Sequence, residues 1–471
     1  MTFDQDAVLA AIDRAVAKAS QASTSWGESD APVRAALLRG LALALEHNQA
    51  ELVGIANDET GLGESRLNGE VARTVFQLRG FADVVDAGVP YRRVDDAAVA
   101  GPPPVGRPHL TRVQRPLGAV AVFCASNFPF AFSVLGGDTA SALAAGCPVI
   151  VKAHAGHPAL SRAVYALARQ VVAEQGLPEG ILTLVEGASR QSGVHLVQHP
   201  HIAAVAFTGS WQGGMALRKV ANERPRPVPF YGELGSLNPL VALPAALQEQ
   251  SDILAALLAG SITQGCGQFC TSPGVIVVLD DPASERFIEQ LISAIRPIQT
   301  HRMLTPSIRA GFDHASTNVA SNTHQLFQPM ADGDGPAPRL YSVDAATFIA
   351  NDALREEMFG PAALIVKATS VEQIEQVLGA IGGALTTTLW GLEQDSEPNR
   401  ALARAAQAIA GRVLFAGVPT GVAICAAQQH GGPWPSSTAP QNTSVGYAAI
   451  ERFLRPVALQ DAPAWLFNGQ A

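Results

Sequence analysis

The segment Leu117-Gly-Ala-Val-Ala-Val-Phe-Cys-Ala-Ser-Asn-Phe-Pro129 decides the fold of this chain. Its first part, Leu117 to Cys124, is an uninterrupted apolar run of the length of one strand, and a loop follows from Ala125 to Pro129. A strand without a polar face must be covered on both sides, which is typical of a parallel sheet between two layers of helices. The segment therefore predicts an α/β fold.

The residues that follow repeat this alternation of short apolar runs and helical patterns. Helices are expected over roughly Phe132 to Ala145 and Ser161 to Gln175, and strands over Cys147 to Val151, Thr183 to Val185 and Ala203 to Phe207. Strands separated by helices indicate a parallel sheet, which is the usual setting for a dinucleotide. We therefore expect a dinucleotide-binding domain here.

The flanking regions have different patterns. Residues 5–80 show apolar residues at helical spacing and predict several amphipathic helices, whereas the Pro-rich stretch at 81–110 marks a connection between units. A second α/β stretch runs from about residue 237 to 425. The remaining strands are expected at Gly274 to Leu279, Ala362 to Val366 and Arg455 to Leu459.

The composition narrows the class of protein. A chain of 471 residues with 48% hydrophobic and 15% charged residues exceeds one ordinary core and excludes global disorder. The net charge of −9, without a basic stripe, argues against nucleic acid and anionic membranes as partners. No apolar run reaches the roughly 18 residues of a membrane span, and Asp4, Asp6 and Asp13 interrupt any signal-peptide core. We expect a cytoplasmic protein.

The cysteines form an odd, widely spaced set that matches no metal-ligand pattern, so no metal site is predicted. Four of them fit free thiols in a reducing compartment. Cys270 differs because it ends the turn Gly265-Cys-Gly-Gln-Phe-Cys270, whose glycines let the backbone turn sharply and approach a ligand. A cysteine in this place can expose its sulfur as a nucleophile, and a buried core thiol is the alternative.

Two further segments place polar residues in apolar surroundings. In Phe230-Tyr-Gly-Glu-Leu-Gly-Ser236, an apolar setting is expected to raise the pKa of Glu233, which suits a general base; an N-terminal helix charge or an ion pair is the alternative. Asn127 follows a buried strand, so its amide can point into the ligand crevice at the strand ends. Turn chemistry before a proline is the alternative for Asn127.

Together these segments resemble the motifs of the aldehyde dehydrogenase superfamily, over nearly the whole chain. Asn127-Phe-Pro129 resembles the oxyanion-hole loop, Glu233-Leu-Gly235 the general-base motif and Gly267-Gln-Phe-Cys270 the nucleophile motif. The resemblance implies that a Cys270 thiolate attacks an aldehyde, that Asn127 and the Cys270 N–H hold the oxyanion, and that Glu233 activates the water that hydrolyses the thioester. The implied reaction oxidises the aldehyde with a nicotinamide cofactor and needs no metal.

Other motifs resemble the cofactor site of this superfamily. Val151-Lys152 resembles the segment whose lysine reaches the cofactor ribose, and the turn that begins at Phe207 resembles the phosphate-binding turn. In Glu356-Glu-Met-Phe-Gly-Pro361, the resemblance implies that Glu357 holds the nicotinamide ribose and that Phe359 packs near the ring. The implied cofactor-binding set is Lys152, Phe207, Thr208, Gly209, Ser210, Gly214, Glu357 and Phe359.

Two positions bear on the choice of cofactor. NAD-preferring relatives often carry a glutamate three residues after the lysine, but Ala155 stands there and does not repel a 2′-phosphate. Arg190 lies where some NADP-using members carry a phosphate-binding arginine, and an ordinary surface arginine is the alternative. The turn Gly209 to Gly214 is not Gly-x-Gly-x-x-Gly, so the usual ribose-acid rule does not transfer. We predict NADP, with NAD as a second cofactor.

The C-terminal motifs resemble those of 2-oxoglutarate semialdehyde (2,5-dioxovalerate) dehydrogenases and of NADP-dependent fatty aldehyde dehydrogenases. The resemblance implies a small aldehyde, either 2,5-dioxovalerate or an aliphatic one. A substrate carboxylate needs a cationic or amide partner, which no motif identifies. The motifs are Pro419-Thr-Gly-Val422, His430-Gly-Gly-Pro433, Thr443-Ser-Val-Gly446 and Ile450-Glu-Arg-Phe-Leu-Arg-Pro456.

His430 leaves a second enzyme class open. In the fatty-aldehyde relatives a histidine in this motif lies near the catalytic cysteine, where it lowers the thiol pKa or relays a proton; a histidine that structures a Gly-Gly-Pro turn is the alternative. Cys270 with His430 would also serve a cysteine hydrolase, although that leaves the dinucleotide-type sheet unexplained. A catalytically silent scaffold is a third reading, against which Asn127, Glu233 and Cys270 all weigh.

The resemblance implies three structural units. A Rossmann-type dinucleotide-binding domain is expected at 1–100 and 116–236, and an α/β catalytic domain at 237–439. A small β bridging and oligomerisation element is expected at 101–115 and 440–471. A projecting strand pair leaves sheet edges to be paired, so we expect a homodimer or homotetramer.

Overall fold

The strand predicted after Leu117 lies at the centre of a five-stranded parallel sheet in the computed structural model, which describes residues 5–187, 189–330 and 333–467. The strand order is β5-β4-β3-β6-β7, and all four residues of the central strand are buried. The strands are β3 (Val120–Phe123), β4 (Val149–Lys152), β5 (Leu182–Val185), β6 (Ala204–Thr208) and β7 (Phe230–Glu233).

Helices cover both faces of this sheet, as the apolar strands require. Alternate residues of β3 show the two layers: Val120 and Val122 pack with one helix layer, and Ala121 and Phe123 with the other. The first layer holds α2 (Ala31–His47), α3 (Gln49–Thr60), α4 (Glu64–Asp86), α5 (Gly137–Ala145) and α6 (Pro158–Glu174). The second holds α1 (Gln5–Gly27), α7 (Arg190–Gln198) and α8 (Trp211–Glu223).

One predicted helix boundary is wrong. Helix α5 begins at Gly137 rather than near Phe132, because the preceding residues form tight turns. The N–H groups of Phe130 and Ala131 donate to the carboxylate of Glu70, and the N–H of Gly137 donates to the carbonyl of Ala131. The carboxylate of Glu70 on α4 thus holds Phe130 and Ala131 in the turns that precede α5.

The second sheet has seven strands in the order β10-β11-β12-β9-β8-β13-β14, and all neighbours are parallel except β10 and β11. Its strands are β8 (Leu240–Ala242), β9 (Val275–Leu279), β10 (His324–Phe327), β11 (Arg339–Asp344), β12 (Ala362–Ala368), β13 (Ala384–Trp390) and β14 (Ala410–Leu414). One face packs on α9 (Pro244–Thr263) and α10 (Pro282–Ile295), and the other on α11 (Pro306–Ala320), α12 (Ala345–Ala350), α13 (Val371–Ile381) and α14 (Glu397–Ile409).

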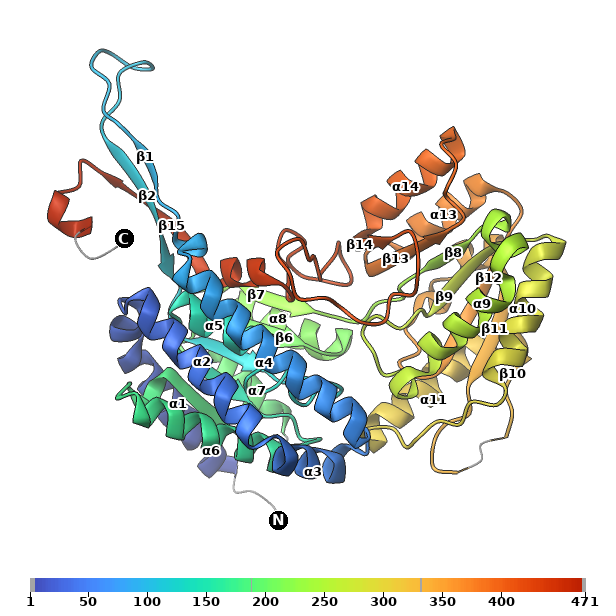
Figure 1. Ribbon diagram of the computed structural model, residues 1–471, viewed down its shortest axis with the longest axis horizontal. Coiled ribbons are helices and arrows are strands. Elements are labelled where there is room, and N and C mark those ends of the chain that lie inside the picture. The colour runs from blue at the N-terminus through green and yellow to red at the C-terminus, as the bar shows by residue number, and fades with distance from the viewer. Residues whose placement is uncertain (1–4, 188, 331–332, 468–471) are drawn as a thin grey trace.

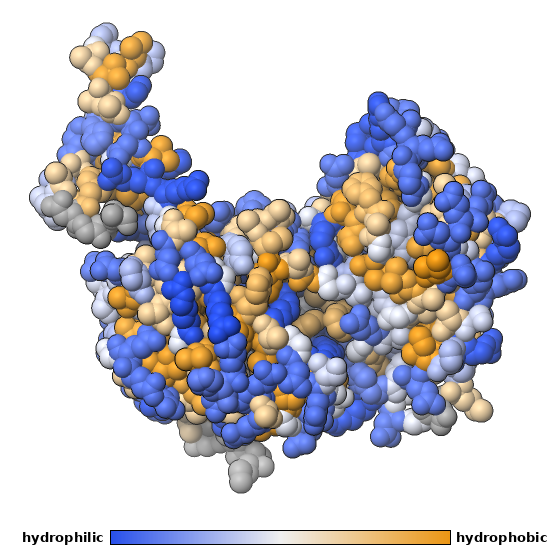
Figure 2. Space-filling model, in the orientation of Figure 1, coloured by the Kyte–Doolittle hydropathy of each residue, from blue (hydrophilic) through white to orange (hydrophobic). Residues whose placement is uncertain are grey.

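A three-stranded antiparallel sheet projects from the first lobe as an arm (Figure 1). It contains β1 (Val94–Asp96), β2 (Leu110–Pro116) and β15 (Leu454–Gln460), so the C-terminal strand pairs with a hairpin that follows the first four helices. Figure 2 shows apolar colour on this arm, where Val105 and Trp465 are exposed. The short 3-10 helices are η1 (Val89–Tyr91), η2 (Glu179–Ile181), η3 (Gln264–Gly267), η4 (Asp352–Arg355), η5 (Tyr447–Phe453) and η6 (Ala464–Phe467).

The sheets correspond to the three units expected from the sequence, and the residue limits of those units stay a prediction. The segment between β14 and η5 runs across the two lobes in Figure 1 and carries the C-terminal motifs. Across the ranges that the structure describes, no helix is long and apolar enough to cross a membrane.

Candidate active site

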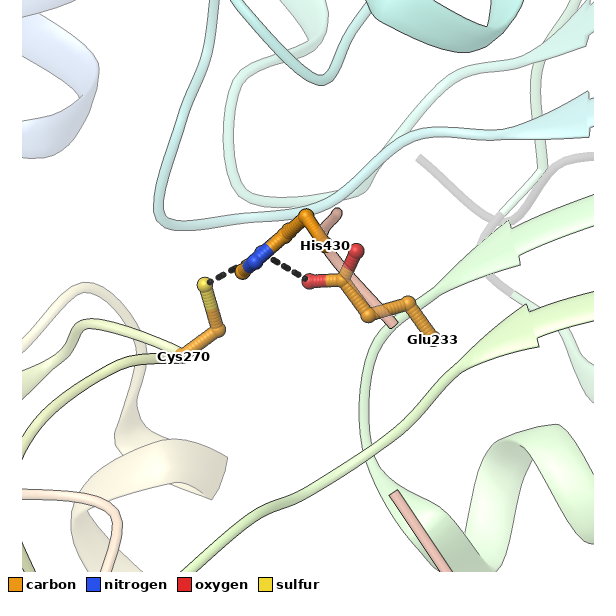
Figure 3. Close-up of side chains that lie close together, drawn as sticks. All are labelled: Glu233, Cys270 and His430. Carbon is orange, nitrogen blue, oxygen red and sulfur yellow. Dashed lines mark hydrogen bonds and ion pairs between the residues drawn. The ribbon is translucent and has the colours of Figure 1, made fainter. Parts of the chain in front are cut away.

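Three side chains from distant parts of the chain meet where the two lobes face each other (Figure 3). Glu233 is the last residue of β7, and Cys270 lies in the loop between η3 and β9. His430 lies on the segment that crosses between the lobes. Each lobe therefore supplies one residue, and the crossing segment supplies the third.

His430 lies between the other two side chains. Its Nε2 is 3.6 Å from Cys270 Sγ and 3.1 Å from Glu233 Oε1. His430 is fully buried and Glu233 is 4% exposed, whereas Cys270 is half-buried. Ser444 donates a hydrogen bond to the other carboxylate oxygen of Glu233. The carboxylate thus lies in a desolvated site, with one oxygen hydrogen-bonded to Ser444 and the other close to His430 but without a hydrogen bond from a described residue.

Cys270 and Glu233 both lie against the same ring nitrogen of His430, Nε2. Nδ1 makes no hydrogen bond to any residue that the structure describes. In a cysteine hydrolase of the relay type, one ring nitrogen faces the nucleophile and the other is oriented by an acid. This arrangement disfavours the hydrolase reading, because one Nε2 cannot serve both partners at once.

The charges around Glu233 and Cys270 correct the expectation that the pKa of Glu233 is raised. Burial acts to raise the pKa of Glu233, but the charge and hydrogen bond of His430 and the hydrogen bonds of Ser444 and Cys270 outweigh it and lower that pKa. The predicted upward shift is therefore wrong, because the sequence could not show these partners. Burial, together with the charges of Glu233 and Glu357, raises the pKa of the Cys270 thiol well above its usual value. The resting site favours a carboxylate beside a neutral thiol.

The nucleophile loop is held in an unusual backbone conformation. Gly265, Cys266 and Gly267 have φ values of 57°, 60° and 65°, and a Cβ on Gly267 would collide with the backbone of Gly360. Only glycine fits this close approach between the Cys270 loop and the 356–361 motif. Asn238 fixes the other side by donating from Nδ2 to the carbonyl of Cys270 at 2.7 Å.

The predicted oxyanion residue lies against the same loop. Asn127 is 7% exposed, and its Nδ2 donates to the carbonyl of Gln268 at 3.0 Å. Arg66 donates to the backbone carbonyl of Asn127 at 2.5 Å and lies over the rings of Phe128 and Phe269. The bond to Gln268 places the Asn127 amide against the loop that ends at Cys270.

The predicted phosphate-binding turn begins at the carboxyl end of β6. Phe207 and Thr208 end this strand, and Ser210 caps α8 by accepting a hydrogen bond from the N–H of Gly213 at 3.2 Å. The turn brings Gly209 and Gly214 against the ring of Phe207. The buried Thr208 Oγ1 has no partner among the described residues. A free hydroxyl beside a helix N-terminus fits a phosphate group.

The other predicted cofactor residues lie on separate elements of both lobes. Lys152 ends β4, two strands from β6, and donates from Nζ to the carbonyl of Ala153 at 3.1 Å. Ala155 is exposed in the turn after β4, and Arg190 is exposed at the start of α7. Glu357 and Phe359 are half-buried, and the carboxylate of Glu357 packs where Gly235 leaves room for it.

Comparison with known proteins decides the family. The sequence model of the aldehyde dehydrogenase family matches residues 5–456. The chain belongs to the aldehyde dehydrogenase family. As a member of it, the chain is an NAD(P)-dependent oxidoreductase that acts on aldehydes.

Two relatives of this aldehyde dehydrogenase are similar over almost its whole length. It is 43% identical to alpha-ketoglutaric semialdehyde dehydrogenase 2 of Azospirillum brasilense over 465 residues, which cover 97% of this chain and 88% of the relative. It is 37% identical to alpha-ketoglutaric semialdehyde dehydrogenase of Acinetobacter baylyi, over 97% of this chain and 87% of the relative.

Solved structures confirm the fold of this aldehyde dehydrogenase. A 1-pyrroline-5-carboxylate dehydrogenase from Thermus with bound NAD superposes with a TM-score of 0.80 at 20% identity, over 96% of this chain and 85% of that chain. Proline utilization A of Bradyrhizobium japonicum gives a TM-score of 0.79 at 24% identity over 96% of this chain, which spans only 46% of that longer chain.

The structure adds residues to the site to which the sequence motifs assign no role. Asn238 and Ser444 hold the Cys270 loop and Glu233, and α4 contributes Arg66, Glu70 and Arg73. The three residues of α4 are spaced i, i+4 and i+7, so they share one face of the helix. The sequence signal for these three residues was the presence of charges on a helix face that is otherwise apolar and faces the core.

Proposed function

We propose that this enzyme oxidises 2-oxoglutarate semialdehyde (2,5-dioxovalerate) to 2-oxoglutarate, with NADP as the preferred oxidant. The observation that carries the proposal is the meeting of Cys270, Glu233 and His430 between the lobes, in a chain whose two relatives above are semialdehyde dehydrogenases. Fatty or other aliphatic aldehydes are the alternative substrates.

The residues of the site supply a complete route to the acid. Cys270 attacks the aldehyde carbon, and its proton passes to Glu233 as the sulfur–carbon bond forms. The amide of Asn127 and the N–H of Cys270 stabilise the oxyanion, each such donor contributing roughly 3 kcal/mol. Glu233 then releases the thiol proton to solvent. After oxidation its carboxylate takes a proton from the water that hydrolyses the Cys270 thioester.

Bound NAD(P) would supply the two-electron oxidation. Lys152 would bind the adenosine ribose, Ser210 and the α8 N-terminus the phosphates, and Glu357 the nicotinamide ribose. The unpartnered Thr208 hydroxyl supports this placement because it offers a hydrogen bond at that helix end. Phe207, Gly209, Gly214 and Phe359 would shape the walls of the site.

The preference for NADP is supported by the residues around Lys152. Ala155 presents no carboxylate, and Arg190 is exposed and free to approach a 2′-phosphate. The neighbouring carboxylate of Glu186 is paired with Arg162 at 2.6 Å, which reduces its repulsion. We expect kcat/KM to be higher with NADP than with NAD, and a strong preference for NAD would contradict this proposal.

Steady-state kinetics test the proposed substrate. With 2,5-dioxovalerate, succinic semialdehyde, glutaraldehyde and a long-chain aldehyde, each with both cofactors, 2,5-dioxovalerate should give the highest kcat/KM. A margin of about tenfold corresponds to one well-made polar contact of roughly 1.4 kcal/mol. A long-chain aldehyde with the highest kcat/KM would favour the alternative substrate class.

Glu357 gives cofactor binding a predictable dependence on pH. Burial raises its pKa to about 7, against the opposing hydrogen bond from the backbone of Ser236. The ionised carboxylate accepts ribose hydrogen bonds best, so cofactor Kd should fall up to about tenfold as the pH rises through that pKa. Calorimetric titration of Glu357→Gln should lose this dependence, whereas Glu356→Gln should keep it. Wild-type pH dependence in Glu357→Gln would contradict the role.

His430 is proposed to assist the thiol. Its Nε2 lies close enough to both Cys270 and Glu233 to help a proton move between them. His430→Asn should therefore slow alkylation of Cys270 by iodoacetamide at neutral pH, measured as a second-order rate constant. His314→Asn, an exposed histidine on α11, is the matched control. An unchanged alkylation rate in His430→Asn would leave His430 with a structural role alone.

The arm supports a proposed homodimer or homotetramer. Its sheet order, β1-β2-β15, leaves two edge strands, and exposed edges are normally paired or covered. Val105 and Trp465 add exposed apolar surface to the same arm.

A further inference from the structure

Two arginines approach the active site from opposite lobes without a carboxylate partner. Arg73 comes from α4 and Arg412 from β14, and neither forms a salt bridge with any carboxylate that the structure describes. Both are half-buried. The charge of Glu70 acts on Arg73 from the same helix, but no ion pair joins the two among the described residues. Two half-buried guanidinium groups without an ion pair are a candidate site for an anionic ligand.

The two guanidinium groups are tied to one short piece of chain. Arg412 donates from Nη1 to the carbonyl of Gly421 at 2.8 Å and from Nη2 to the carbonyl of Pro419 at 2.5 Å. Arg73 donates from Nη2 to the carbonyl of Val422 at 3.4 Å and lies over the ring of Phe132. Residues 419–422 therefore bring both positive charges to the same place.

Each arginine keeps an unused donor. Arg73 Nη1 and Arg412 Nε are buried and have no hydrogen-bond partner among the described residues. Buried donors are nearly always paired, so unpaired ones beside a reactive group point to a missing ligand. Both charges also act on the Cys270 sulfur, which places them around the nucleophile rather than elsewhere on the surface.

Arg66 lies nearby but is already engaged. Its guanidinium is close to the rings of Phe128 and Phe269, and it donates to the carbonyl of Asn127. These contacts make it a positioning residue for the loop that carries Asn127. Its Nη1 is also unpartnered among the described residues, but the two rings hold its guanidinium group against the Asn127 loop, whereas Arg73 and Arg412 meet at residues 419–422.

We propose that Arg73 and Arg412 form the subsite for the distal carboxylate of the substrate, an inference that rests on the proposed function. A 2-oxo acid presents a carboxylate and an adjacent carbonyl, which together accept several hydrogen bonds. Each of the two guanidinium groups offers an unused N–H donor and a positive charge, which together suit this acceptor set. The subsite selects aldehydes that carry an acid group at the far end of a short chain.

The test compares two aldehydes that share a five-carbon chain. 2,5-dioxovalerate carries the carboxylate and pentanal does not, so the ratio of their kcat/KM values isolates recognition of the acid group. Arg73→Met and Arg412→Met should each lower this ratio at least about 30-fold, mainly through KM. The ratio is insensitive to any change in thiol reactivity, because that change affects both aldehydes alike.

Matched controls and a conservative variant complete the design. Arg79→Met removes an exposed arginine of α4 that pairs with Glu46, and Arg404→Met removes one of α14 that pairs with Glu397; both should keep the wild-type ratio. Arg73→Lys should fall between wild type and Arg73→Met, since lysine keeps the charge but not the planar guanidinium group. It also replaces Arg73→Met if that variant does not fold.

Binding of glutarate, measured by calorimetry, separates the two levels of the proposal. If the wild-type enzyme shows no preference for 2,5-dioxovalerate over pentanal, the proposed substrate is wrong. The arginine subsite then stands only if glutarate binds the wild type and loses about 30-fold or more of its affinity in Arg73→Met. An unchanged kcat/KM ratio in both methionine variants of an enzyme that does prefer 2,5-dioxovalerate would overturn the subsite.

Discussion

Cys270→Ala is expected to abolish aldehyde oxidation, with a loss in kcat of roughly 10⁴-fold or more. Cys270 is the half-buried thiol of the cluster, and its sulfur faces both His430 and the Glu233 carboxylate. Without the sulfur no thioester forms, and the remaining contacts cannot replace a covalent step. The loss is measured as the rate of absorbance gain at 340 nm with aldehyde and NADP.

The control for this variant is another cysteine of the same chain. Cys425→Ala removes an exposed thiol and should leave the rate within twofold of wild type, a limit that corresponds to roughly 0.4 kcal/mol. If Cys270→Ala kept substantial activity and Cys425→Ala did not, the nucleophile would have been assigned to the wrong residue.

Glu233→Gln is expected to lower steady-state turnover by about 10²- to 10⁴-fold, the range typical of a lost general base. Glutamine keeps the shape of the side chain but cannot accept a proton from the hydrolytic water. The Cys270 thioester should then accumulate, and mass spectrometry of the quenched enzyme should show the added acyl group. Because the pKa of Glu233 is lowered, wild-type turnover should persist below the pH at which an ordinary glutamate is protonated.

The kinetics of the Glu233→Gln variant identify the step in which Glu233 acts. If one turnover of NADP reduction is rapid and the acid product is then released slowly, Glu233 acts in thioester hydrolysis. A variant with neither rapid turnover nor acyl-enzyme places Glu233 only in the activation of Cys270. Glu223→Gln at the exposed end of α8 is the matched control and should behave like wild type.

The sequence predicts those parts of the fold that depend on local pattern. The apolar run from Leu117 predicts the buried strand β3, since its alternate residues must pack on two helix layers. The motifs around Asn127, Glu233 and Cys270 predict residues that the structure brings together. In each case the information lies within a few neighbouring residues.

The parts that sequence cannot predict are set by contacts between distant segments. The start of α5 depends on Glu70, and the lowered pKa of Glu233 depends on His430 and Ser444. Arg73 and Arg412 are far apart in the chain and share only the carbonyl groups of residues 419–422. Such positions carry no local signature, because their chemistry arises from tertiary packing.

Glu233, Cys270 and His430 come from two lobes and a crossing segment. The distances between their side chains therefore depend on how the lobes are aligned. Glu233 belongs to the first lobe, Cys270 to the second, and His430 to the segment that crosses between the lobes. A rotation of one lobe that shifts atoms by about 1 Å is enough to cost about 100-fold in rate, yet it leaves both sheets intact. We therefore expect heat and mild denaturants to inactivate this enzyme before they unfold either sheet.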